Sequence, residues 1–202
     1  MAVRSKEYNL DRYAPAVVVT TTADAAPNTN PTTSLARGVF IVGNDGSVDG
    51  GYIAPVTITR PANTTAYSAV DVVGGVLTIS AAGPASSTSM LTGTRLELDI
   101  AAVPTGMTYF TLHLYSATPP SAYADNAAWD LPSGDRSVYM GNAILGTPVD
   151  LGSTLYVEAN QINKLMKLVG GSTLYGYLVT ATGYTPAAVS EVYKLTVCSV
   201  AI

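Results

Sequence analysis

Strict alternation of apolar and polar residues over 94–100 (TRLELDI) is the strongest constraint on the fold of this chain. Because successive side chains of a β-strand point to opposite faces, its aliphatic residues share one face and its charged residues the other. This pattern predicts a half-buried strand. Further strand candidates, separated by connectors rich in Gly, Pro and Ser, lie at 56–59, 76–80, 108–115, 154–158, 174–179 and 191–197. About eight short strands at this spacing predict an all-β fold, an antiparallel β-sandwich of the jelly-roll kind.

The first fifty residues differ from the rest. A β-forming run at 16–22 and an apolar run at 38–42 flank the turn-rich segment 24–31. We therefore divide the chain into an extended N-terminal arm or outlying strands at 1–50 and a β-sandwich domain at 51–202. Extended segments can add a strand to a partner's sheet, although the two apolar runs can equally pair within their own domain. The candidate partner-binding residues of the arm are Arg4, Lys6, Tyr8, Arg12, Tyr13, Val17, Val18, Val19 and Phe40.

Helix signals are scarce. Residues 125–129 and 133–140 each predict one short helical turn, the second with Ser133 as a possible N-cap. Residues 161–168 fit either a strand or a short helical face, and the pattern does not decide between them.

Charge is unusually sparse, since Asp, Glu, Lys and Arg make up 12 % of the chain and hydrophobic residues 48 %. Soluble domains commonly carry about a quarter charged residues. The 13 tyrosines combine a large apolar face with a hydroxyl that needs a partner, which suits surfaces that become buried on assembly. We expect much of this surface to be covered by other proteins, with Tyr123, Trp129 and Tyr184 as possible surface contacts.

The same composition argues against several partners. A net charge of −4 gives no electrostatic case for nucleic acid, whose binding domains are usually basic. No apolar run approaches the roughly 18 residues of a membrane-spanning helix, so we expect no membrane partner. Cys198 is the one cysteine and lies in an apolar run, which predicts a small buried residue rather than a disulfide.

Catalytic signals are weak. His113 is the one histidine, and by alternation it shares a face with Thr111 and Tyr115, which favours a surface or pocket-lining imidazole with a hydrogen bond. The sequence contains no nucleophile elbow, phosphate loop or dinucleotide fingerprint. Glu97 and Asp99 share a strand face, as a glycosidase pair would, but more simply lie on the solvent side. We therefore expect a protein that is not an enzyme.

We expect neither metal nor cofactor. Zinc needs several His or Cys ligands, and the chain has one of each. Asp125, Asp130 and Asp135 could supply oxygen ligands to calcium, but their spacing matches no EF-hand loop. They are better explained as loop acids that cap turns.

Three stretches carry a family resemblance. Residues 59–67 (TRPANTTAY) lead to 71–75 (DVVGG), residues 112–120 (LHLYSATPP) lead to 125–132 (DNAAWDLP), and residues 175–180 (YGYLVT) precede 184–187 (YTPA). Together they resemble small virion structural proteins of tailed bacteriophages, of the capsid decoration or cement type. The resemblance covers residues 56 to 200 and leaves the arm unmatched.

The resemblance implies a β-sandwich, often a dimer or trimer, that sits on the outer surface of the assembled capsid and strengthens contacts between capsid proteins. It further implies synthesis in the host cytoplasm, the major capsid protein and copies of itself as partners, and no catalytic residues. We hypothesise a decoration protein. A tail, neck or head-fibre protein is the first alternative, and a carbohydrate-binding β-sandwich module is the second.

Overall fold

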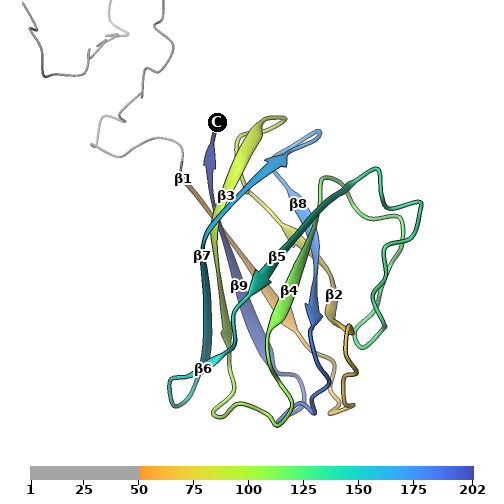
Figure 1. Ribbon diagram of the computed structural model, residues 1–202, viewed down its shortest axis with the longest axis vertical. Helices are drawn as coiled ribbons and strands as arrows, with labels where there is room; N and C mark the ends of the chain where they lie inside the picture. The colour runs from red at the N-terminus through yellow and green to blue at the C-terminus, as the bar shows by residue number, and fades with distance from the viewer. Residues whose placement is uncertain (1–50) are drawn as a thin grey trace, which may run out of the picture. The chain divides into compact units, whose positions relative to one another are not determined.

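The computed structural model describes residues 51–202 (Figure 1). The predicted arm at 1–50 lies outside the described residues, together with its candidate partner-binding residues Arg4, Lys6, Tyr8, Arg12, Tyr13, Val17, Val18, Val19 and Phe40.

The described residues form two antiparallel sheets packed face to face, which confirms the predicted all-β sandwich. The five-stranded sheet has the order β1 (Gly51–Thr59), β9 (Val192–Ala201), β3 (Thr88–Leu98), β7 (Leu155–Lys167) and β6 (Val149–Asp150). The four-stranded sheet has the order β2 (Val72–Ile79), β8 (Leu174–Thr180), β4 (Phe110–Tyr115) and β5 (Tyr139–Leu145). No helix long and apolar enough to cross a membrane occurs among the described residues.

The strand pairing is nested. β1 pairs with β9, β2 with β8, β3 with β7 and β4 with β5, and successive pairs belong alternately to the two sheets. This is the pattern of one long antiparallel hairpin wound around a barrel-like core, with β9–β3 and β8–β4 contacts completing the sheets. The fold is therefore a jelly roll, as the sequence predicted.

The alternation in β3 has the predicted effect. Leu96 and Leu98 are buried between the sheets, whereas Arg95 lies on the outer face. Tyr193, Leu195 and Val197 of β9 face the same core. One contiguous hydrophobic cluster fills the space between the sheets, so the two layers are held mainly by apolar burial.

The two predicted helical turns are found as hydrogen-bonded turns and not as helices. Residues 125–126 form a simple turn with Asn126 at a φ of 63°, and residues 133–138 form consecutive turns that end where β5 begins. Backbone hydrogen bonds from Val138 N–H and Tyr139 N–H to the Asp135 carbonyl close these turns. The ambiguous segment 161–168 is mostly strand, because β7 continues to Lys167.

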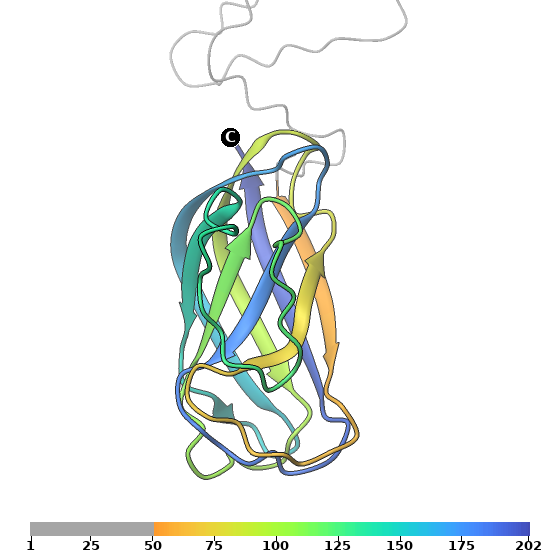
Figure 2. The same cartoon turned by 90° about the vertical axis from the view of Figure 1, so that its right-hand side faces the viewer.

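The loops divide between the two ends of the sandwich. Four of them, at 60–71, 99–109, 146–154 and 181–191, gather at one end, which we call the loop end (bottom of Figure 1). Loops 80–87 and 168–173 lie at the other end, beside Gly51 and the C-terminus. The long loop 116–138, which we call the covering loop, runs back over the outer face of the four-stranded sheet (Figure 2).

Each long sheet edge is interrupted. β1 carries Pro55, which has no N–H to donate to an added strand. The register of β2 shifts between Val73 and Leu77, around two glycines with positive φ, and that of β5 shifts next to Gly141. β7 bulges where Gln161 and Asn163 have φ values of 58° and 49°. Prolines and bulges of this kind oppose edge-to-edge pairing.

Candidate functional site

The surface of the domain carries even less charge than the sequence suggests. Four charged side chains of the described region, Arg60, Asp71, Asp135 and Glu191, are buried at 5 % exposure or less. These residues use their charges inside the fold, so they contribute little to the outer surface. The surface therefore depends on hydroxyl, amide and apolar groups for recognition.

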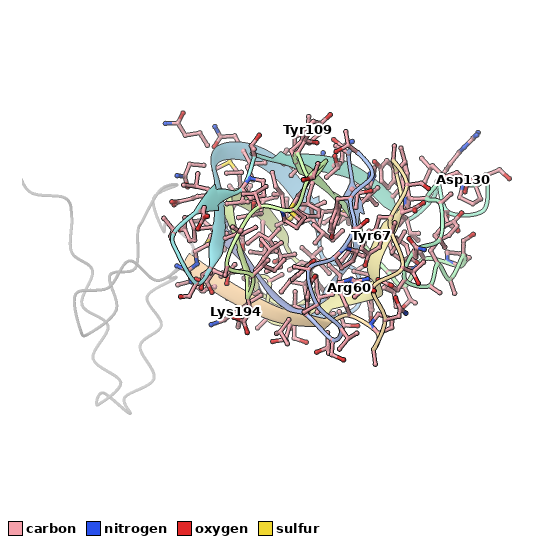
Figure 3. All side chains as sticks on the ribbon, turned by 90° about the horizontal axis from the view of Figure 1, so that it is seen from below. Arg60, Tyr67, Tyr109, Asp130 and Lys194 are labelled. Carbon is pink, nitrogen blue, oxygen red and sulfur yellow. The ribbon has the colours of Figure 1, made fainter. Side chains whose placement is uncertain are left out.

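The loop end is a large surface with few exposed charges. Asp99 and Asp150 are the exposed charged residues of its four loops. Exposed apolar side chains are spread over all four loops: Val70, Val103, Tyr109, Val149, Leu151 and Val189. Figure 3 looks onto this end, with Tyr109 at the periphery and Arg60 and Tyr67 in the interior. Apolar surface with few charges is typical of the centre of protein interfaces.

A buried polar network anchors two of these loops, 60–71 and 181–191. The guanidinium of Arg60, which follows β1, donates from Nε to the Tyr67 hydroxyl at 2.5 Å. The Tyr67 hydroxyl in turn donates to Asp125 Oδ1 of the covering loop at 2.6 Å. The same carboxylate oxygen accepts a hydrogen bond from Gly74 N–H at 2.8 Å. Arg60 also lies over the Tyr67 ring, 4.8 Å from its centroid.

The second half of the network comes from the loop 181–191 and β9. Glu191 Oε2 lies 3.6 Å from Arg60 Nη1 and accepts a hydrogen bond from the Tyr193 hydroxyl at 2.7 Å. Glu191 Oε1 accepts from Ala188 N–H, and the hydroxyls of Tyr184 and Tyr193 share a hydrogen bond at 3.1 Å. Arg60 is thus held between two carboxylates, since Asp125 Oδ2 lies 4.0 Å from Nη2.

Burial dominates the electrostatics of this network. Desolvation raises the pKa of Tyr67, Tyr184 and Tyr193, so these hydroxyls stay neutral and act as hydrogen-bond donors. For Arg60, burial alone would lower the pKa, but the Tyr67 hydrogen bond and the nearby carboxylate of Asp125 outweigh it and the net shift is upward. A permanently charged Arg60 therefore holds elements far apart in the sequence in one arrangement.

The covering loop encloses an aromatic cluster on the outer face of the four-stranded sheet. Trp129 stacks on His113 of β4, with ring centroids 3.6 Å apart. His113 Nδ1 shares a hydrogen bond of 3.0 Å with the Tyr139 hydroxyl of β5. The imidazole is 5 % exposed, and burial lowers its pKa to about 4, so it is neutral near pH 7. The predicted hydrogen bond is present, but His113 is not a surface residue.

Hydrogen bonds fix the covering loop along its length. Its backbone pairs with the start of β2, through Val72 N–H to the Ala127 carbonyl and Trp129 N–H to the Val70 carbonyl. The buried Asp135 carboxylate accepts a hydrogen bond from Ser121 N–H at 3.1 Å. This loop is part of the folded domain rather than a free binding loop.

The three residues predicted as surface contacts differ in how deeply they are buried. Tyr184 is 4 % exposed and packs against Tyr67, with ring centroids 5.0 Å apart, so the prediction for this residue is wrong. Tyr123 and Trp129 are half-buried in the covering loop. Tyr123 donates from its hydroxyl to Asp130, and Trp129 Nε1 donates to the Tyr115 hydroxyl at 3.3 Å. Contacts with other proteins at Tyr123 and Trp129 stay a prediction.

The described residues bring no metal-binding group of side chains together. No set of three or more His, Cys, Asp or Glu side chains converges within residues 51–202. His113 has no carboxylate or hydroxyl nucleophile in the arrangement that acid–base chemistry needs, since its partners are Trp129 and Tyr139.

Within residues 51–202, no loop covers the outer face of the five-stranded sheet. This face bears a hollow of about 230 Å³, lined by Ile53, Thr92, Gly93, Thr94, Arg95, Glu158, Asn160, Thr196 and Cys198. Cys198 is half-buried there, opposite Ile53 in the adjacent strand, so the prediction that it is buried is wrong. Sequence alternation could have placed both residues on this face. It could not predict that no described loop covers the face, because no local sequence pattern marks such an absence.

No protein-family model matches this sequence, and no curated protein matches it. Two solved virus particles show weak structural similarity. One is a full particle of Israeli acute paralysis virus, with 16 % identity, a TM-score of 0.27, and coverage of 73 % of this chain and 69 % of that chain. The other is the native virion of Kashmir bee virus, with 16 % identity, a TM-score of 0.29, and coverage of 93 % and 82 % respectively. TM-scores of this size carry no functional argument, and neither title names a bacteriophage.

Proposed function

We propose that this protein is a structural component of a virus particle that acts by binding, as a decoration or cement protein on the outer surface of a tailed-bacteriophage capsid. In this proposal the loop end contacts the major capsid protein. The sequence resemblance supplies the virion assignment, and the jelly-roll topology agrees with it, because viral capsid proteins are among the proteins that use this fold. Fold alone does not specify function, so the surface must carry the rest.

The single observation that carries the proposal is the loop end. It combines exposed apolar side chains from four loops with few exposed charges, and the buried Arg60 network holds two of those loops, 60–71 and 181–191, in place. A surface already held in its binding conformation loses little entropy on docking, which favours association.

The described residues give little support to chemistry or sugar binding. The His113 imidazole covers one face of Trp129, so this lone tryptophan is a poor platform for a sugar ring. Lectins also use jelly rolls, and a carbohydrate-binding module therefore remains the alternative from another class. A tail, neck or head-fibre protein is the alternative within the virion.

The proposal is tested with empty heads of the bacteriophage that carries this gene. We expect the purified full-length protein to co-sediment with expanded heads and to raise their melting temperature. Val189→Asp places a charge in the loop end and should weaken binding at least about tenfold. Val169→Asp is the matched control, because Val169 is 57 % exposed at the opposite end and Val189 is 55 % exposed.

Three results would contradict parts of the proposal. Detection of the protein only in tail fractions of disrupted virions would reject the head assignment. Equal effects of the two valine variants would reject the loop end as the contact surface. Clear micromolar binding on a glycan array, without binding to heads, would favour the carbohydrate-binding alternative.

A further inference from the structure

The two outer faces of the sandwich differ in whether a described loop covers them. The covering loop and its aromatic cluster close the outer face of the four-stranded sheet. The outer face of β1, β9, β3 and β7, which we call the bare face, has no such cover among the described residues. The bare face therefore has a surface that a partner can occupy without displacing any described element.

The upper half of the bare face, next to Gly51, is mainly apolar, with Lys167 of β7 as its charged side chain. Ile53 is 71 % exposed and Leu165 is 64 % exposed. Between them lie Met90 and Val200, which are directly paired across β3 and β9, and Cys198, which is paired with Ile53. Gly93, opposite Cys198, leaves the hollow described above, whose lining joins Ile53 and Cys198 to the polar residues Arg95, Glu158 and Asn160.

The charges of the lower half cancel. Arg95 of β3 lies directly opposite Glu158 of β7, and Glu97 lies directly opposite Lys194 of β9. The lower half thus has two positive and two negative side chains, and the upper half adds Lys167 of β7, which is paired with Thr88. Since the charges of the lower half balance, two copies can face each other there without net repulsion.

The size of the bare face suits a dimer. Four strands at about 4.8 Å spacing and nine residues at about 3.3 Å give a plane of about 19 by 30 Å, or about 570 Å² in projection. A specific interface buries about 800 Å² of accessible surface per partner, and side chains make accessible area larger than projected area. The face is therefore of the right order for a stable two-fold contact.

We propose that the bare face is a two-fold symmetric interface with a second copy of this chain, centred on the hollow beside Ile53 and Cys198. In a two-fold interface the same patch serves both subunits, so it must complement itself. A mainly apolar half and an internally balanced charged half meet this condition. The inference deepens the proposed function by naming the self-association surface, but its test uses no capsid and can fail independently of head binding.

The test is sedimentation equilibrium of the full-length protein at about 1 to 100 µM, the range in which weak to moderate dimers dissociate. We expect the wild type to dimerise and Ile53→Lys to raise the dissociation constant at least about tenfold. Ile144→Lys is the matched control, because Ile144 is 64 % exposed on β5 of the other sheet. Trp129 fluorescence and the melting temperature verify that both variants fold.

Cys198 provides a second readout, because it is the only cysteine of the chain. We expect its alkylation by N-ethylmaleimide, followed by intact mass, to slow as the dimer fraction of the wild type rises and to stay fast in Ile53→Lys. A wild type that is monomeric throughout, or equal weakening by both isoleucine variants, would overturn the inference. Equal protection of Cys198 in the monomer would overturn it as well, since something other than a second copy would then cover the face.

Discussion

The stacked pair of His113 and Trp129 makes the stability of this domain depend on pH. The pKa of His113 falls from 6.5 to about 4 because the imidazole is buried, and no charged side chain contributes to the shift. In the unfolded chain the same group would titrate near 6.5. The unfolded state therefore binds more protons than the folded state between these values, and stability falls as the pH is lowered through this window.

The magnitude follows from the shift. Each pKa unit corresponds to about 1.4 kcal/mol, so the free energy of unfolding should fall by about 3 kcal/mol between pH 7 and pH 4 through this residue alone. His113→Phe keeps an aromatic ring under Trp129 and removes both the titration and the hydrogen bond to Tyr139. The lost hydrogen bond should cost about 1 kcal/mol at neutral pH.

The two stability curves should therefore cross. We expect the wild type to be more stable than His113→Phe at pH 7 and less stable below about pH 5.5, where protonation of the unfolded wild type costs more than the missing hydrogen bond. Urea titrations from pH 7 to pH 4.5, followed by the emission of the single tryptophan, measure both curves. Parallel curves over this range would show that His113 is not buried as a neutral imidazole, and the account of the covering loop would fail.

Three further predictions concern the fold. Tyr67→Phe removes the hydroxyl between Arg60 and a carboxylate and should lower the free energy of unfolding by about 2 to 4 kcal/mol in urea titrations, whereas Tyr109→Phe, at a half-exposed position, should change it by less than about 0.5. Gly74→Ala should lower the melting temperature, because Gly74 has a φ of +77° and an added Cβ would collide with the Ile58 side chain. Gly134→Ala is the control and should leave the melting temperature unchanged, because Gly134 has open space around it; equal effects of the two variants would reject the packing argument. Deleting residues 1–50 should leave a cooperatively unfolding domain that binds heads poorly, and an unfolded product would place that segment in the core.

Alternation predicted the strands that carry one apolar and one polar face. β3 is the clearest case, because its buried leucines and exposed charges follow the pleat. The same parity placed His113 on the outer side of β4. It could not reveal that this side is closed, because the cover comes from a loop whose aromatic residues show no period of their own.

The features that the sequence did not predict share one cause: they depend on contacts between residues distant in sequence. β5 was missed because Gly141 and Asn142 interrupt its pattern, and only pairing with β4 makes it a strand. Tyr184 stands among turn residues and looked exposed, yet its ring packs on Tyr67 and its hydroxyl meets Tyr193. The Arg60 network is of the same kind, since its members come from four separate segments.

The interrupted sheet edges have a consequence for how copies of this chain can grow together. Pairing along open edges adds one molecule after another without limit and leads to fibres. A protein with so few charged residues has few charged side chains with which to oppose such growth. With Pro55 in β1 and bulges in the other long edges, association is restricted to faces and loops, where contacts saturate after a fixed number of partners. Copies of this chain can therefore associate at high local concentration and still form an assembly of limited size.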